Sequence, residues 1–104
     1  MNIEQNQELF DKKQEEFIVE LAGIIKNAFE EHELPEDVVY DATDKLVFNI
    51  GALLDGSATA GELDDPTYAY LAFRKSDDAD ELVVSPIGSY VHEVAMNIVE
   101  DVFE

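Results

Sequence analysis

The first part of the chain places apolar residues at the three- and four-residue steps of an amphipathic helix. From about Glu4 to Glu31 these positions are Phe10, Phe17, Ile18, Leu21, Ile24, Ile25, Ala28 and Phe29. Pro35 follows a charged break and suits the first turn of a second helix, which we expect from about Pro35 to Leu54. Its apolar positions are Val39, Ala42, Leu46, Phe48, Ile50, Leu53 and Leu54, with Val38 and Val47 alongside them. Two such helices joined by a short break predict an antiparallel helical hairpin.

The pattern changes at Gly56. Residues 56–67 read GSATAGELDDPT, a run of small, polar and turn-forming residues that predicts an internal loop. Residues 67–74 then alternate and are rich in aromatic side chains, and after a polar turn an apolar run resumes at Leu82, which predicts a β-hairpin. From about Ser89 helical spacing returns and predicts a third helix.

The predicted fold is therefore α+β, with a two-helix antiparallel hairpin, then a β-hairpin, then a C-terminal helix (α-α-β-β-α). We expect residues 1–104 to form a single domain with one layer of helices packed on a small antiparallel sheet. The hairpin face with Leu71 and Phe73 should lie on the helices, which leaves Tyr68 and Tyr70 on the other face. These tyrosines and the free strand edges would suit self-association, so a homodimer is an open alternative to a monomer.

Charge is the strongest signal in the composition, because 25 Asp and Glu residues face only six Lys and Arg, a net charge of −19. Most carboxylates must therefore meet solvent or another molecule. Such a charge repels nucleic acid and anionic membranes and accelerates encounter with basic surfaces. Hydrophobic residues make up 46% of the chain, which is too many for a disordered acidic tail. We expect a folded protein with a basic protein partner and no direct binding to nucleic acid or membrane.

The sequence contains no cysteine, which excludes disulfides, thiolate metal sites and cysteine nucleophiles. The first ten residues lack the basic start and apolar run of a signal peptide, and no apolar stretch reaches bilayer length. A cytoplasmic location is the expectation that follows.

Motifs for catalysis are weak. Ser89, His92 and Glu93 are near one another in the sequence, but no nucleophile elbow surrounds Ser89. The glycines match neither phosphate-binding pattern, and Gly23 and Gly51 inside predicted helices indicate close helix approach instead. We expect no enzyme activity, metal site or cofactor, although a cleft with an apolar wall and a carboxylate beside His92 would favour an enzyme.

Two acidic groups are candidates for partner binding. Asp37, Asp41 and Asp44 recur at steps of four and three, so their carboxylates follow one helix face about 4.5 to 6 Å apart. Such a line would imitate the phosphates of nucleic acid. Lys45 supplies a counter-charge, which weakens the imitation, and the alternative interpretation is an acidic face that meets only solvent. The full set of predicted partner-binding residues is Glu33, Asp37, Asp41, Asp44, Asp77, Asp78, Asp80 and Glu81.

The sequence thus predicts a non-catalytic acidic binding protein, an inhibitor or nucleic-acid mimic that acts on a basic protein. The first alternative is a structural or assembly protein that self-associates through its β-hairpin, with Tyr68 and Tyr70 in the contact and acidity serving solubility. Adaptation to high salt is a further alternative explanation of the acidic excess.

Overall fold

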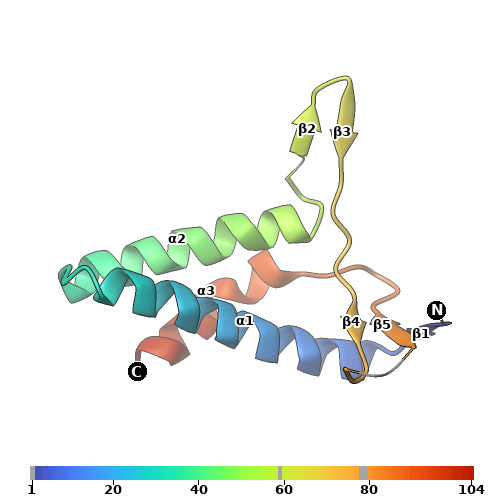
Figure 1. Cartoon of the computed structure of the whole chain (residues 1–104), viewed down its shortest axis with the longest axis horizontal. Coiled ribbons are helices and arrows are strands. Elements are labelled where there is room, and N and C mark those ends of the chain that lie inside the picture. Colours follow the sequence, from blue (N-terminus) through green and yellow to red (C-terminus); the bar gives the residue numbers. More distant parts are fainter. Residues whose placement is uncertain (1, 59, 78–79) are drawn as a thin grey trace.

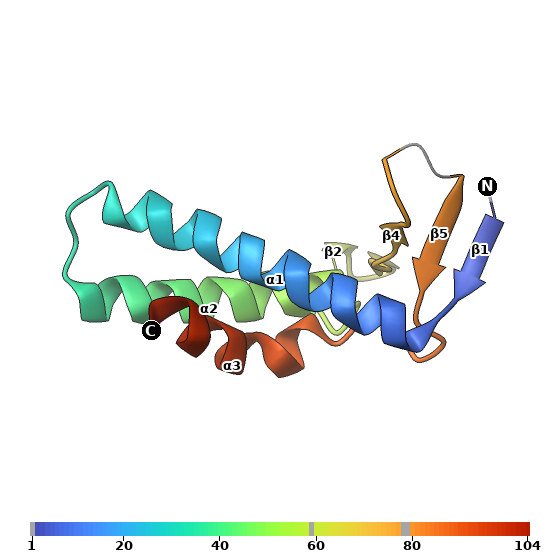
Figure 2. The same ribbon diagram turned by 90° about the horizontal axis from the view of Figure 1, so that it is seen from below.

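A computed structural model describes residues 2–58, 60–77 and 80–104 (Figures 1 and 2). The elements in chain order are β1 (Asn2–Gln5), α1 (Gln7–Glu30), α2 (Glu36–Leu54), β2 (Ala60–Glu62), β3 (Asp65–Thr67), β4 (Phe73–Arg74), β5 (Glu81–Val84) and α3 (Val91–Phe103). The predicted α+β class and the order helix, helix, strands, helix are confirmed.

The three helices pack against one another and hold the main core. The side chain of Asn6 caps α1 by accepting a hydrogen bond from the Leu9 backbone N–H at 3.0 Å. Figure 2 shows α1 and α2 as an antiparallel pair joined at one end of the molecule, with α3 beside them. The central cluster of buried residues consists of Ile18, Ala22, Val47, Val91, Ala95, Ile98 and Val99.

The buried faces of α1 and α2 differ from the predicted apolar stripes. The buried positions follow strict four-residue steps and are Phe10, Gln14, Ile18 and Ala22 in α1, and Val39, Thr43, Val47 and Gly51 in α2. Several larger apolar side chains that we placed in the core, including Ile24, Leu46 and Phe48, are instead exposed. Small and polar side chains at the buried steps let the helices approach, which a ranking by hydrophobicity does not capture.

A three-stranded sheet in the order β1-β5-β4 lies at the start of α1. β4 is antiparallel to β5, as a hairpin requires, but β1 is parallel to β5 with Ile3 opposite Leu82. The sheet is therefore mixed rather than antiparallel. The polar segment Asn2–Gln5 has no alternating apolar pattern, and its strand conformation depends on β5, 79 residues away in the sequence.

The predicted loop at 56–67 contains a small hairpin of β2 and β3, which stands away from the helices in Figure 1. At its tip the Leu63 side chain is fully exposed. The first strand that we predicted at 67–74 is broken, because Thr67 ends β3, residues 68–72 are not in a strand, and only Phe73–Arg74 pair with β5. The predicted facing is nevertheless observed, because the Phe73 ring packs on Phe10 at 5.3 Å between centroids, and Tyr68 and Tyr70 are each 64% exposed.

Among the described residues, no helix combines the length with the apolar character that a bilayer-spanning segment requires.

Candidate functional site

The most distinctive surface is a groove between α2 and α3. Two packed helices leave a groove on each side of their contact, and α1 lies in one of these, against Val47, Ala95 and Val99. The other is lined by residues at three- and four-residue steps on each helix, which places them on one face of it. These residues, which we call the α2–α3 groove, are Asp37, Tyr40, Asp44 and Phe48 from α2, and His92, Met96, Glu100 and Phe103 from α3.

One end of the groove is an acidic and aromatic compartment of about 660 Å³. The rings of Tyr40 and Phe103 meet edge to face, with 5.0 Å between their centroids. Around them stand the carboxylates of Glu36, Asp37, Glu100 and Glu104. Desolvation, followed by the negative charges of Glu100 and Asp44, raises the pKa of the Tyr40 hydroxyl. The compartment thus combines aromatic surface with a strongly negative potential.

The other end is a more apolar compartment of about 480 Å³. Phe48 and Met96 are its large apolar side chains and remain 48% and 59% exposed. The Phe48 ring stands at 85° to the His92 ring, with 5.7 Å between centroids. Asp44 and Glu93 add carboxylates to this compartment. It offers a hydrophobic contact surface bordered by negative charge.

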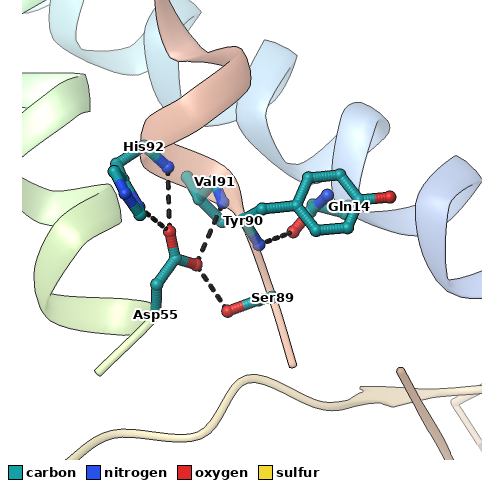
Figure 3. A network of polar contacts seen from close by, with 6 residues as sticks. All are labelled: Gln14, Asp55, Ser89, Tyr90, Val91 and His92. Carbon is teal, nitrogen blue, oxygen red and sulfur yellow. Dashed lines mark hydrogen bonds and ion pairs between the residues drawn. The ribbon is translucent and has the colours of Figure 1, made fainter. Parts of the chain in front are cut away.

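Asp55 holds the His92 end of the groove in place (Figure 3). Tyr90, at the N-cap position of α3, makes no side-chain cap. The Asp55 carboxylate takes this role by accepting hydrogen bonds from the backbone N–H groups of Val91 at 3.0 Å and His92 at 2.9 Å. It also accepts a hydrogen bond from the Ser89 hydroxyl and pairs with Nδ1 of His92. A residue just past the end of α2 therefore caps α3.

These contacts stabilise the ionised form of Asp55. Its side chain is only 1% exposed. Burial acts to raise the pKa, but hydrogen bonds from Ser89, His92 and Val91 outweigh it, and the pKa lies below its ordinary value of 3.8. The carboxylate therefore acts as a charged cap at the positive end of the α3 dipole.

Asp55, His92 and Ser89 resemble the members of a catalytic triad in type but not in arrangement. In a triad the serine hydroxyl bonds the histidine nitrogen that the carboxylate leaves free. Here Ser89 donates to Asp55 instead. Among the described residues that line the adjoining compartment, none is Ser, Thr or Cys. The carboxylate beside His92 thus serves the architecture of α3, and its contacts are those of a helix cap.

A second polar network ties α1 to the segment before α3. Ser85 donates to Gln7 Oε1 at 2.7 Å, and Gln7 Nε2 donates to Asp11 at 2.7 Å. The Tyr90 hydroxyl also donates to Asp11. The backbone N–H of Tyr90 donates to the side chain of the buried Gln14 at 2.9 Å (Figure 3). Burial, then the hydrogen bond to Asp11, raises the pKa of Tyr90. Both α1 and α2 therefore fix the start of α3.

Four of the six basic residues lie away from the groove. Lys12 and Lys75 border one shallow depression near the start of α1, and Lys13 and Arg74 border another. Among the described residues lining the α2–α3 groove compartments there are six carboxylates and one basic side chain, Lys45. Six carboxylates thus meet one lysine in the lining, and a second, Lys26 of α1, places its ammonium 4.7 Å from the centroid of the Phe103 ring.

The predicted partner-binding residues divide between distant places. Asp37 and Asp44 line the groove, whereas Asp41 pairs with Lys45 at 3.0 Å. Glu33 lies in the turn before α2 with a φ of 56°. The remaining described ones, Asp77, Asp80 and Glu81, border the β4–β5 turn at the other end of the molecule, and Asp78 lies outside the described residues (Figure 1). The predicted set does not form one surface.

Sequence reasoning missed the α3 half of the groove. His92, Met96, Glu100 and Phe103 follow steps of four, four and three, the same spacing that marked the acidic face of α2. Their mixed chemistry conceals the stripe, because neither an apolar pattern nor an acidic pattern contains all four residues.

Comparison of the chain with protein-family models, with curated proteins and with solved structures gave no match. Within the described part of the chain, no three His, Asp or Glu side chains are placed to share a metal ion.

Proposed function

We propose that the protein is a non-catalytic binding protein that holds a basic protein partner in the α2–α3 groove. The observation that supports this most is the acidic and aromatic compartment around Tyr40 and Phe103. Lys and Arg side chains interact favourably with both carboxylates and aromatic faces, so a surface that offers both suits them. A partner that uses the same basic surface for its own activity would be inhibited while that surface is bound in the groove.

Charge and apolar contact have separate roles in this proposal. The net charge of −19 attracts a basic protein from a distance and raises its association rate, an effect that salt screens. Phe48 and Met96 then make apolar contacts with the partner, and salt does not weaken these contacts. Binding should therefore be faster at low salt but retain affinity at physiological ionic strength.

The test compares two triple variants that remove the same charge. Asp37→Asn, Asp44→Asn and Glu100→Gln neutralise the groove, whereas Glu15→Gln, Glu16→Gln and Glu20→Gln neutralise exposed positions on α1. The probe is a helical peptide rich in arginine and leucine, titrated by calorimetry at two salt concentrations. We expect the groove variant to lose about tenfold in affinity, equivalent to about 1.4 kcal/mol, and the α1 variant to lose much less. An equal loss in both would show that only total charge matters and would contradict the proposal.

Self-association is a second candidate, favoured by the β2–β3 hairpin and the tyrosines beside it. Leu63 at the hairpin tip is fully exposed, and Tyr68 and Tyr70 are 64% exposed. Because copies of this chain repel one another, their association would strengthen with salt, whereas binding to a basic partner would weaken. Light scattering after size exclusion, at low and high salt, with Leu63→Ser as the variant, separates the two. A monomer at every salt concentration would exclude this candidate.

A further inference from the structure

Resting on the proposed function, we infer that the segment that occupies the α2–α3 groove is a basic amphipathic helix. It places an arginine or lysine in the aromatic compartment and large apolar side chains over Phe48 and Met96, two to three turns away. The packing of the helices, the length of the groove and the chemistry of its two ends each support this inference.

The packing leaves a place for one more helix. α1 lies in one of the two grooves beside the α2–α3 contact and buries the face with Val47, Ala95 and Val99. In the other groove Phe48 and Met96 remain half exposed although they sit between two helices. A helix laid there would complete a four-helix arrangement, with the ridges of the new helix in the groove between the old ones.

The length of the groove sets the spacing of the contacts. Tyr40 and Phe48 are eight residues apart on α2, about 12 Å along the axis at 1.5 Å per residue. His92 and Phe103 are eleven residues apart on α3, about 16 Å on the same basis. A partner helix that reaches both ends therefore uses side chains seven to eleven residues apart, and those at i, i+7 and i+11 share one face.

The chemistry assigns a type of side chain to each end. At the Tyr40 end, four carboxylates and two rings favour a cation, and Lys26 already places its ammonium 4.7 Å from the centroid of Phe103. At the Phe48 end, Phe48 and Met96 favour a large apolar side chain. A second copy of this chain is a poor occupant, since both molecules carry a net charge of −19.

The test uses two peptides of identical composition and charge, each about 20 residues or 30 Å long as a helix. The matched peptide carries arginine at i and leucine at i+7 and i+11. In its isomer the leucines stand at i+9 and i+13, on the opposite helix face at 100° per residue. Affinity is measured by fluorescence anisotropy for the native protein, for Phe48→Ser with Met96→Ser, for the triple variant at Asp37, Asp44 and Glu100, and for Ile24→Ser as a matched control. Ile24 lies on α1 and is 59% exposed, as Met96 is.

We expect the matched peptide to bind the native protein and Ile24→Ser about tenfold more tightly than the isomer, and the groove double variant to lose this preference. Equal binding of both peptides that still depends on Asp37, Asp44 and Glu100 would overturn the helix register and leave the proposed function standing. Absence of binding by either peptide would overturn both. Tighter binding of the isomer, or a preference unchanged in the double variant, would overturn the assignment of the apolar end.

Discussion

Replacing Gly51 with alanine tests how closely α2 approaches the start of α3. A Cβ atom at this position would lie 2.8 Å from Val91 Cγ1 and 2.9 Å from the backbone N of His92. The backbone of α3 cannot yield as a flexible side chain can, because Asp55 and Gln14 hold its first turn. Gly51→Ala therefore forces α3 outward or strains the cap.

The magnitude follows from two opposing effects. Alanine is favoured over glycine inside a helix by about 1 kcal/mol. Overpacking a tight contact costs about 1–3 kcal/mol. Gly23 in α1 supplies the matched control, because a Cβ there meets nothing within 4 Å. We therefore expect Gly23→Ala to raise the free energy of unfolding by about 1 kcal/mol, and Gly51→Ala to be less stable than Gly23→Ala by about 1–3 kcal/mol.

The assay is urea unfolding followed by far-ultraviolet circular dichroism at fixed ionic strength, since an ionic denaturant would screen the charge. A difference of 1 kcal/mol also moves the melting temperature of a domain of this size by about 4–8 °C. Equal stabilisation by the two alanines would refute the reasoning, because it would mean that α2 and α3 do not meet at Gly51.

Three further predictions concern the cap, the core and the hairpin. Asp55→Asn should cost about 1–3 kcal/mol of unfolding free energy, because it removes a buried, charged acceptor of several donors. The folded pKa of Asp55 lies below its ordinary value of 3.8, so its stabilisation is present above that pH and is lost as the pH falls through the folded pKa. In urea unfolding experiments from pH 6 to pH 3, the free energy of unfolding should therefore fall less steeply for Asp55→Asn than for the native protein. Parallel curves for the two proteins would contradict the cap. Phe10→Ala should cost about 3–5 kcal/mol in the same experiments, since Phe10 is fully buried against Phe73, and a loss below 1 kcal/mol would contradict that packing. Leu63→Ser should change stability by less than about 0.5 kcal/mol, because the side chain is fully exposed, and a larger loss would show that the hairpin tip packs on the body.

Local patterns predicted the helices well and their contacts poorly. The periodicity of apolar residues located three helices to within a few residues. It found the buried faces only in part. Phe10, Ile18 and Val39 are buried as the pattern predicts, but Gln14, Thr43 and Gly51 are core residues that no hydrophobic pattern indicates. Gly51 was interpreted correctly as a close approach, but the same interpretation of Gly23 was wrong, since its surroundings are open. The two glycines occupy similar helical contexts, and only the packing separates them.

Long-range partners account for the rest of what the sequence did not show. β1 exists because β5 lies beside it, and Asp55 caps a helix that begins 36 residues later in the sequence. Asp37 and Asp44 were identified as candidate partner-binding residues from α2 alone, but the α3 side of the groove required the antiparallel packing of α2 on α3. A one-dimensional pattern records spacing within an element and holds no information on which faces meet.

The central claim is that the α2–α3 groove, and not the acidic surface as a whole, receives a basic partner. Nuclear magnetic resonance tests it most directly, by following the backbone amide signals of the isotope-labelled protein as the arginine- and leucine-rich helical peptide is added at physiological salt. The account predicts that the largest shifts occur at Tyr40, Asp44, Phe48, Met96 and Glu100, with little change along the exposed face of α1. Shifts of similar size at acidic residues over the whole molecule, or shifts centred on the β2–β3 hairpin, would contradict it.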